Sequence, residues 1–242
     1  MITKYLKLLL VKISRVIFWI TPEEFKIKKK KELSPIVKIL YDKQVKSSYE
    51  TFEKYFEKSL IFEDEWSTRG YAIDTALLND SKSQNFYLEF GTYKGGTANF
   101  FSQYVNKLYT FDSFTGLKED WTGFHHAKGF FNLNKKIPKL NNNVEPIIGY
   151  VQDTFEDFLK KHNPKINFAH MDLDTYDSTK YILERIKPYL LDGSILIFDE
   201  LYNYINWQIG EYKALKEVFN DNEYDFKSFN LSGSQVVIQI KK

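Results

Sequence analysis

Acidic residues follow two strand-like apolar runs in the second half of the sequence. Asp172 and Asp174 come directly after the run 166–171, and Asp199 and Glu200 come after the next run. Because the carboxyl ends of parallel strands meet at one edge of a sheet, we expect these carboxylates to lie close together. Such a cluster is unfavourable unless a cation neutralises it, and oxygen ligands favour Mg²⁺ before Ca²⁺ or Mn²⁺. The alternative is that Asp174 or Asp177 caps the next helix and that Glu200 points to solvent.

A glycine-rich turn follows an earlier apolar run. Gly91 lets the chain turn sharply there, while Gly95 and Gly96 let backbone N–H groups at the start of the next helix approach a ligand closely. A dinucleotide-binding fingerprint needs a further glycine where this chain has Thr92 and Tyr93. Binding of a pyrophosphate is therefore disfavoured, which argues against a nicotinamide oxidoreductase.

Two more acids flank this turn. Glu89 precedes it and suits a cationic amino-acid ligand, whose ammonium and sulfonium groups gain from a nearby carboxylate. Asp112 ends the next strand-like run, 21 residues after Gly91, where an acid accepts hydrogen bonds from both hydroxyls of a ribose. As isolated features, Glu89 could be a helix-cap carboxylate and Asp112 a turn former. Their joint position favours binding of a ligand.

Short apolar runs alternate with helical stretches after residue 80, which indicates an α/β fold with a doubly wound parallel sheet. Before that, from residue 33 to about residue 78, apolar residues recur with helical spacing. Later helices are expected to begin near Thr97, Thr154 and Ser178. The last two runs are too close for a parallel crossover, so they form an antiparallel hairpin. The strand-like runs are residues 86–90, 108–111, 144–148, 166–171, 195–198, 224–230 and 235–240.

Four ordered motifs resemble those of class I S-adenosylmethionine-dependent methyltransferases. More narrowly, they are similar to the macrocin O-methyltransferase type, whose members methylate sugar hydroxyls with magnesium. The resemblance covers roughly residues 66–240. It implies a Rossmann-like, seven-stranded sheet that ends in the antiparallel hairpin, with helices added at the N-terminus. The motifs are residues 89–97, 111–117, 171–179 and 198–200.

The resemblance also implies which residues hold the ligands. The metal ligands fall on Asp172, Asp199 and Glu200, and the family usually has Asp at the last position, where Glu reaches one methylene further. Residues 149–153 are expected against the adenine, with Asp153 near its amino group or, alternatively, at the N-cap of the next helix. The expected contacts of S-adenosylmethionine are Glu89, Gly91, Thr92, Gly95, Gly96, Asp112, Ser113, Asp153 and Asp172.

Methyl transfer to oxygen needs an acceptor that is at least partly deprotonated. Mg²⁺ on the hydroxyl lowers its pKa, and a nearby base takes the proton. Some relatives place a His three residues after the first metal-binding Asp, but this chain has Thr175 there, so Asp172 and Asp174 are the candidate bases. We expect His170 to pack in the sheet, and the aromatic loop 121–131 to be a lid or part of the core. Residues predicted on the acceptor side are Trp121, His125, His126, Tyr202 and Trp207.

The charge is concentrated at the N-terminus. Residues 1–31 carry +7, from nine basic and two acidic side chains, whereas the whole chain carries +2 and the remainder therefore −5. Residues 2–20 have a basic face and an apolar face at helical spacing, and no uncharged run is long enough to span a bilayer. We expect this helix to lie on an anionic membrane. Packing of its apolar face on the same chain or on a dimer partner is the alternative.

We therefore expect a basic helix and linker over residues 1–31, a helical cap over 32–80 and a catalytic domain over 81–242. The predicted function is that of a magnesium-dependent O-methyltransferase acting on a sugar hydroxyl of a glycan or glycoside. We expect it in the cytoplasm, peripheral on the inner face of a membrane, and a homo-oligomer is left open. The alternatives are a non-catalytic binding protein of the same fold and a methyltransferase for a small non-sugar hydroxyl. The lack of Cys excludes thiolate metal sites, and the acidic body argues against nucleic acid.

Overall fold

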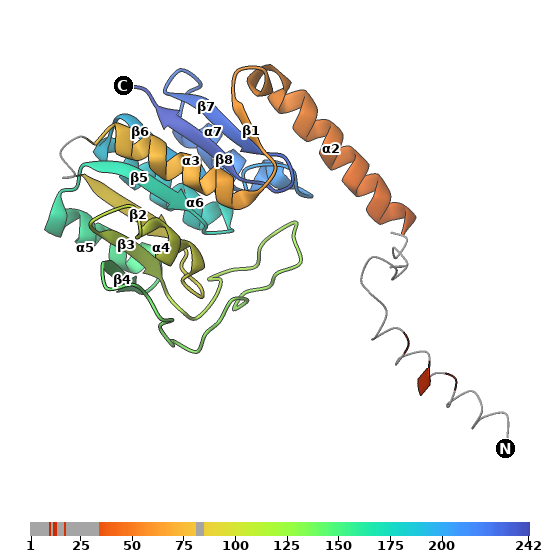
Figure 1. Cartoon of the computed structure of the whole chain (residues 1–242), viewed down its shortest axis with the longest axis horizontal. Coiled ribbons are helices and arrows are strands. Elements are labelled where there is room, and N and C mark those ends of the chain that lie inside the picture. The colour runs from red at the N-terminus through yellow and green to blue at the C-terminus, as the bar shows by residue number, and fades with distance from the viewer. Residues whose placement is uncertain (1–9, 11, 14–16, 18–33, 81–84) are drawn as a thin grey trace. The chain divides into compact units, whose positions relative to one another are not determined.

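The computed structural model describes residues 10, 12, 13, 17, 34–80 and 85–242 (Figure 1). The chain divides into two compact units, residues 1–38 and 39–242. Most of the predicted basic helix and the lysine run after it lie outside the described residues; within that helix, only residues 10, 12, 13 and 17 are described, and all four are helical. In the part of the chain that the structure describes, no helix is both long and apolar enough to cross a membrane.

A sheet of eight strands forms the centre of the larger unit. The strands are β1 (Leu60–Phe62), β2 (Phe86–Phe90), β3 (Leu108–Asp112), β4 (Val144–Ile148), β5 (Ile166–Met171), β6 (Leu190–Phe198), β7 (Tyr224–Asn230) and β8 (Val236–Ile240). Their order across the sheet is β1-β7-β8-β6-β5-β2-β3-β4. Neighbouring strands are parallel except at β8, which runs antiparallel to both β6 and β7. The predicted doubly wound sheet with a C-terminal antiparallel hairpin is confirmed.

Helices cover both faces of this sheet (Figure 1). They are α2 (Pro35–Phe56), α3 (Glu65–Leu78), α4 (Gly96–Phe101), α5 (Val151–His162), α6 (Tyr176–Ile186) and α7 (Glu211–Val218), with the short 3-10 helices η2 (Lys187–Tyr189) and η3 (Trp207–Ile209). On one face, α3 and α4 enclose a core that includes Ile73 and Phe101. On the other face, α5, α6, α7 and the end of α2 enclose a core that includes Phe52 and Phe155.

The middle strands are buried on both faces, which explains why they are continuous apolar runs in the sequence. In β6, Ile195 and Ile197 belong to the core under α3, whereas Leu196 and Phe198 belong to the opposite core. The ladder continues to the acids that end the strands: Asp172 N–H donates to the carbonyl of Phe90 and Asp199 N–H to that of Met171, each at 2.9 Å. The register therefore places these acids side by side at one edge.

Two elements were not expected from the sequence. Residues 60–62 form β1, which pairs in parallel with β7, so the sheet has eight strands where seven were expected. Three residues are too few to interrupt a helical pattern, and pairing with a strand far along the chain decides their conformation. Helix α7 was also not predicted, because it lies in a segment whose aromatic residues suggested acceptor contacts.

Candidate active site

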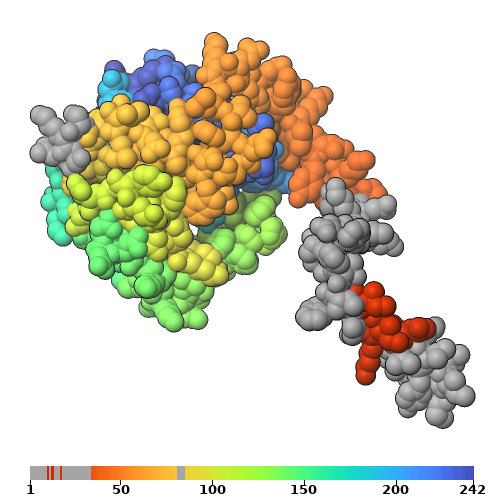
Figure 2. All heavy atoms as spheres, viewed as in Figure 1, coloured from red at the N-terminus to blue at the C-terminus, as the bar shows by residue number. Residues whose placement is uncertain are grey.

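A cavity of about 450 Å³ lies at the carboxyl ends of β2, β3, β5 and β6, and its volume is in the range of small-molecule sites. Its walls are the turn after β2, the loop after β3, the turn after β4 and the acids after β5 and β6. The loop after β3 covers residues 113–143 and runs below the strand ends in Figure 1. It also forms much of the green surface in Figure 2.

The turn after β2 is shaped by the close approach of two strand ends. Gly91 has a φ of +96°, and a Cβ atom there would overlap the carbonyl oxygen of Asp172, so only glycine fits this position. Gly91 and Thr92 line the cavity, as predicted, whereas Gly95 and Gly96 at the start of α4 are not among the lining residues. The structure therefore places the turn itself, and not the start of the helix, at the cavity.

Asp112 connects the two turns that border the cavity. Its Oδ2 accepts hydrogen bonds from the backbone N–H groups of Thr92 (2.9 Å) and Tyr93 (2.7 Å), and its Oδ1 accepts one from Phe114 (2.7 Å). Asp112 and Ser113 both line the cavity. Because each carboxylate oxygen has more than one lone pair, Asp112 can hold these turns and still accept hydrogen bonds from a ribose.

The start of α5 presents Gln152 to the cavity. The Gln152 amide nitrogen donates to Ser178 Oγ at 3.3 Å, while its Oε1 is buried and has no hydrogen-bond partner among the described residues. Asp153 is exposed and is not a lining residue, nor is it the N-cap of α5, which is Tyr150. Of these two residues, Gln152 and not the predicted Asp153 faces the cavity, because neighbouring helix positions point about 100° apart and the sequence leaves the helix start uncertain.

A buried charged network lies behind the strand ends. His170 is fully buried, with its Nδ1 3.3 Å from Glu89 Oε1 and its Nε2 3.5 Å from Asp199 Oδ1. Glu89 is also fully buried and accepts a hydrogen bond from Thr110 Oγ1 at 2.7 Å. Glu89 therefore holds the imidazole and is not among the lining residues, which corrects its predicted contact with the cofactor. The expectation that His170 packs in the sheet is confirmed.

Arg69 of α3 joins this network from a helix that the sequence did not connect with the site. Its Nη2 donates to Asp199 Oδ1 at 2.7 Å and its Nη1 to Glu65 Oε2 at 2.9 Å, while the guanidinium lies 4.9 Å from the ring centroid of Trp66. Gln235 Nε2 donates to the same Asp199 oxygen at 3.2 Å. Only the fold brings these residues together, because 130 positions separate Arg69 from Asp199.

The network separates the pKa values of neighbouring groups. Burial raises the pKa of Asp199, but the hydrogen bond with His170 and the charge of Arg69 outweigh burial and hold that pKa below its usual range. Burial lowers the pKa of His170, whereas hydrogen bonds with Asp199 and Glu89 outweigh it and raise the pKa to about 10. Burial and the charge of Asp199 raise the pKa of Asp172 to about 8. Asp199 is therefore the ionised member of this pair of acids.

The ligand atoms form two groups that could hold a metal ion. Oxygens of Asp172, Asp174 and Glu200 lie within 4.8 Å of one another, and a second group joins Asp172 and Asp199 to His170. All four acids line the cavity. The predicted convergence of the carboxylates is confirmed, and an all-oxygen group of this kind fits a hard divalent cation.

Neither alternative role of these acids is found. The N-cap of α6 is Thr175, and no side chain caps this helix, so Asp174 does not cap it. Glu200 has a buried Oε2 without a partner among the described residues, and its backbone N–H donates to Glu211 Oε2 at 3.0 Å. Burial, together with the charges of nearby acids, raises the pKa values of Asp174 and Glu200 well above their usual range.

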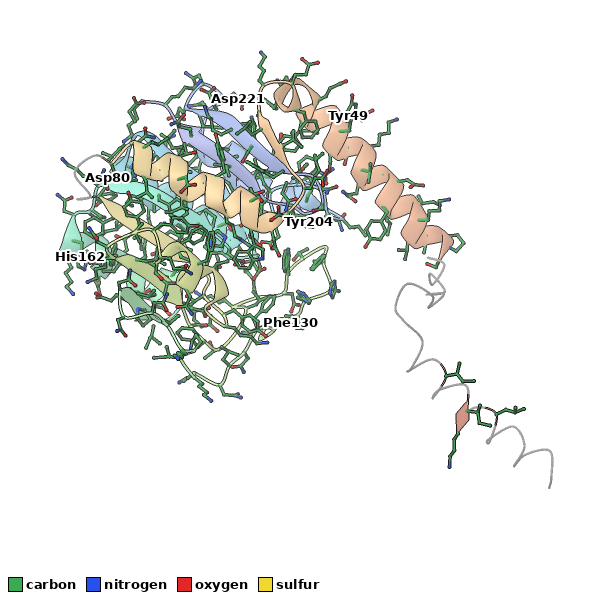
Figure 3. All side chains as sticks on the ribbon, viewed as in Figure 1. Tyr49, Asp80, Phe130, His162, Tyr204 and Asp221 are labelled. Atoms are coloured by element: carbon green, nitrogen blue, oxygen red, sulfur yellow. The ribbon has the colours of Figure 1, made fainter. Side chains whose placement is uncertain are left out.

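Aromatic side chains of the loop after β3 form another wall of the cavity. Trp121 is buried and lines the cavity with His126 and Tyr204, and its ring centroid lies 6.2 Å from that of Tyr204. His126 stacks on Phe130 with 3.7 Å between the ring centroids. Phe130 and Tyr204, labelled in Figure 3, belong to the loop and to the segment after β6. His125 is exposed and is not a lining residue.

Tyr202 and Trp207 belong to the core, which corrects their predicted role on the acceptor side. They are only 2% and 1% exposed, and both pack against Phe52 of α2 at ring-centroid distances of 5.3 and 5.4 Å. Tyr202 Oη donates to the carbonyl of Asn230 at 2.8 Å, and Trp207 Nε1 donates to Ser47 Oγ at 3.2 Å. The sequence could not distinguish these aromatic residues from Tyr204, which does face the cavity.

Comparisons with known proteins agree with this arrangement. Residues 88–201 match the family described as "Methyltransferase domain". The chain is similar to two structures of CalS11, a calicheamicin methyltransferase, both at 20% identity: one has a TM-score of 0.59 over 90% of this chain and 98% of that chain, and the apo structure 0.53 over 88% and 98%. The O-methyltransferase NovP is similar at 17% identity and a TM-score of 0.55, over 73% of this chain and 79% of that chain. No curated protein matches the sequence.

Proposed function

We propose that this chain, a class I methyltransferase with its methyltransferase domain over residues 88–201, is a magnesium-dependent O-methyltransferase that acts on a sugar hydroxyl of a glycan or glycoside. Its fold is that of S-adenosylmethionine-dependent O-methyltransferases. CalS11 is described as a TDP-rhamnose 3′-O-methyltransferase. That description supports a sugar as the acceptor.

The observation that carries the proposal is that one cavity contains both a nucleoside-binding half and an acidic half. Gly91, Asp112 and Gln152 line the first half, with a carboxylate and an unpaired amide oxygen available for a ribose and an adenine. Asp172 and Glu200 line the second half. A methyl donor held in the first half would present its methyl group to an acceptor hydroxyl near these acids.

The aromatic wall supports a sugar acceptor. Trp121, Tyr204 and His126 line the cavity beside the acids, and aromatic faces suit the apolar faces of sugar rings. An acceptor hydroxyl between this wall and the carboxylates would be oriented before transfer.

The acids also fit the predicted magnesium ion. Several carboxylates with raised pKa values face one another, and a hard divalent cation would stabilise their ionised forms. When bound, Mg²⁺ would lower the pKa of the acceptor hydroxyl. Asp172 and Asp174 are the residues proposed to take the acceptor proton, because both line the acidic half of the cavity and are buried or partly buried.

Two measurements test this function. Calorimetric titration should show binding of S-adenosylmethionine, and mass spectrometry of candidate glycosides should show the mass gain of one methyl group. Activity should be lost with EDTA and return with Mg²⁺. Binding of NADH without binding of S-adenosylmethionine would contradict the whole proposal, and full activity in metal-free buffer would contradict its magnesium requirement alone.

The N-terminal segment is proposed to hold the enzyme on an anionic membrane. The support is the charge of +7 on residues 1–31 against −5 on the rest of the chain. Basic residues close to an anionic surface contribute about 1 kcal/mol each. The acceptor would then be met at that surface.

A further inference from the structure

We propose that the hydroxyl group of Tyr204 recognises the acceptor by donating a hydrogen bond to a second hydroxyl of the same sugar. This inference rests on the proposed function and deepens it, because it makes the acceptor a sugar that presents at least two hydroxyl groups to the cavity. It follows from the place of the Tyr204 hydroxyl at the cavity and from its lack of a partner among the described residues.

Tyr204 brings a buried hydroxyl to the acidic half of the cavity. The residue lines the cavity, and its Oη is not exposed to solvent. Its ring packs beside Trp121 and Phe124, with 6.2 and 6.0 Å between the ring centroids. Burial, followed by the charges of Glu211 and Glu200, raises the pKa of Tyr204 above its usual range. The phenol therefore lies on the acidic side and keeps its proton at neutral pH.

This hydroxyl has a proton to donate, and the part of the chain that the structure describes offers no acceptor for it. Trp121 lowers the pKa of Tyr204, but its indole N–H can only donate toward the phenol oxygen and cannot receive the phenol proton. A buried donor without an acceptor costs free energy that a bound ligand recovers. The unpaired hydroxyl therefore marks a contact for the acceptor.

Packing holds the Tyr204 hydroxyl in place. Gly210 precedes α7, and a Cβ atom there would overlap Tyr204 Oη, so glycine leaves the space that the hydroxyl fills. The Tyr204 carbonyl accepts a hydrogen bond from Trp207 N–H at 3.3 Å. Asn206 Nδ2 donates to the carbonyl of Gly123 at 2.8 Å, which joins this segment to the loop after β3. The donor is therefore in position before the acceptor binds, which lowers the entropic cost of binding.

A neutral hydroxyl fits this position better than other groups do. An apolar group would leave the Tyr204 donor unpaired. An anionic group would be repelled by the carboxylates of Asp172, Asp174 and Glu200, which line the same cavity. A hydroxyl can accept a hydrogen bond from Tyr204 and donate its own proton to one of these carboxylates. Because sugars carry hydroxyls on adjacent ring carbons, one acceptor ring can present a first hydroxyl to the acids and a second to Tyr204.

Methyl transfer to simple glycosides by the full-length protein tests this contact. The probes are methyl hexopyranosides and their monodeoxy analogues, with S-adenosylmethionine and Mg²⁺ present, and release of S-adenosylhomocysteine is measured. For a glycoside that is methylated, we expect one monodeoxy analogue to be methylated with a lower kcat/KM, because it lacks the hydroxyl that Tyr204 binds. Tyr204→Phe should lower kcat/KM for the parent glycoside about fivefold to tenfold, mainly through KM, and leave that of this analogue unchanged.

Two further variants control this experiment. Tyr202→Phe is the matched control, because Tyr202 lies in the same segment but its hydroxyl donates to the carbonyl of Asn230 in the core. It should change neither KM nor the preference for the parent glycoside over the analogue. Gly210→Ala is an independent test, because its Cβ would displace the Tyr204 hydroxyl. We expect the same selective loss from Gly210→Ala, and no further loss when it is combined with Tyr204→Phe.

The result can be separated from the proposed function. If Tyr204→Phe lowers kcat/KM equally for the parent glycoside and for every analogue, or lowers neither, this inference is overturned and the methyltransferase assignment stands. The Kd of S-adenosylmethionine should be the same in the variant and in the wild type, since the hydroxyl is proposed to contact the acceptor alone. A wild-type protein that binds S-adenosylmethionine but methylates no glycoside of the panel would contradict the sugar acceptor, and this inference with it.

Discussion

Gln152 and Asp153 are neighbours on α5, but only Gln152 presents a buried, unpaired oxygen at the cavity. We expect Gln152→Leu to weaken S-adenosylmethionine binding by about fivefold to tenfold, because the adenine amino group would lose an acceptor worth about 1 kcal/mol. Calorimetric titration measures this change. Asp153→Asn is the matched control and should bind as the wild type does; equal effects of both substitutions would remove Gln152 from the site.

Asp112 is expected to contribute more to cofactor binding than Gln152. Asp112→Ala should weaken S-adenosylmethionine binding by about tenfold or more, because hydrogen bonds that involve a charged group contribute roughly 1.5 to 3 kcal/mol. Since Asp112 also holds the N–H groups of Thr92, Tyr93 and Phe114, the melting temperature of the variant must be measured beside its affinity. Unchanged or tighter binding in a folded variant would exclude Asp112 from the site.

Residues at strand ends were the most predictable part of the site. The convergence of Asp172, Asp199 and Glu200 follows from parallel pairing alone, because register fixes where a strand ends. The role of Glu89 was less predictable, since a carboxylate one residue before a strand end can face either a ligand or a buried partner. In the structure its partner is the buried His170. No pattern in the sequence connects that histidine with the distant Arg69, so the network had to come from the structure.

At the scale of elements, α3 is important because it carries Arg69 into the network. Asp64 is the N-cap of this helix: its carboxylate accepts hydrogen bonds from Ser67 N (2.9 Å) and Ser67 Oγ (2.6 Å), and these bonds lower the pKa of Asp64. A pKa that is lower in the folded state than in the unfolded state gives stability that is present above the unfolded value of about 4 and is lost as the pH falls through the folded value.

We therefore expect Asp64→Ala to lower the melting temperature at neutral pH, because the helix loses its cap. The loss of stability on acidification below about pH 4 should also be smaller in the variant than in the wild type, since one depressed pKa is gone. Thermal melting monitored by circular dichroism at several pH values measures both effects. Asp74→Ala, at an exposed position within α3, is the control, and an equal fall in melting temperature there would contradict the capping role.

The elements that the sequence predicted are those with a long periodic pattern of apolar residues or with a continuous apolar run that is buried in the fold. The first five predicted strands needed only an apolar run and a glycine or acid after it. The structure confirms the first four to within one residue, whereas β6 begins at Leu190, five residues before the predicted start. Strand β1 was missed because its conformation depends on pairing with β7 and on the hydrogen bond from Leu231 N–H to the carbonyl of Phe62. Such distant contacts leave no local pattern in three residues.

At the scale of the whole molecule, the distribution of charge predicts that an anionic membrane attracts one part of the chain and repels the other. The 211 residues after the basic segment carry a net charge of −5, which anionic lipids would repel, whereas residues 1–31 carry +7. Attraction through the segment must therefore exceed repulsion of the body, and both effects act over a screening length of about 8 Å at physiological salt. Membrane binding should therefore depend on this segment alone.

Deleting residues 1–22 tests this expectation, because it removes the predicted amphipathic helix and keeps residues 88–201, which match the methyltransferase family. We expect the truncated protein to keep its melting temperature and its activity on a soluble acceptor, but no longer to co-sediment with vesicles of anionic lipid. The full-length protein should co-sediment, and less so at high salt, because screening weakens the attraction of its basic residues. Vesicles of neutral lipid are the control. A large fall in melting temperature with unchanged vesicle binding would instead show that the apolar face of this segment packs on protein.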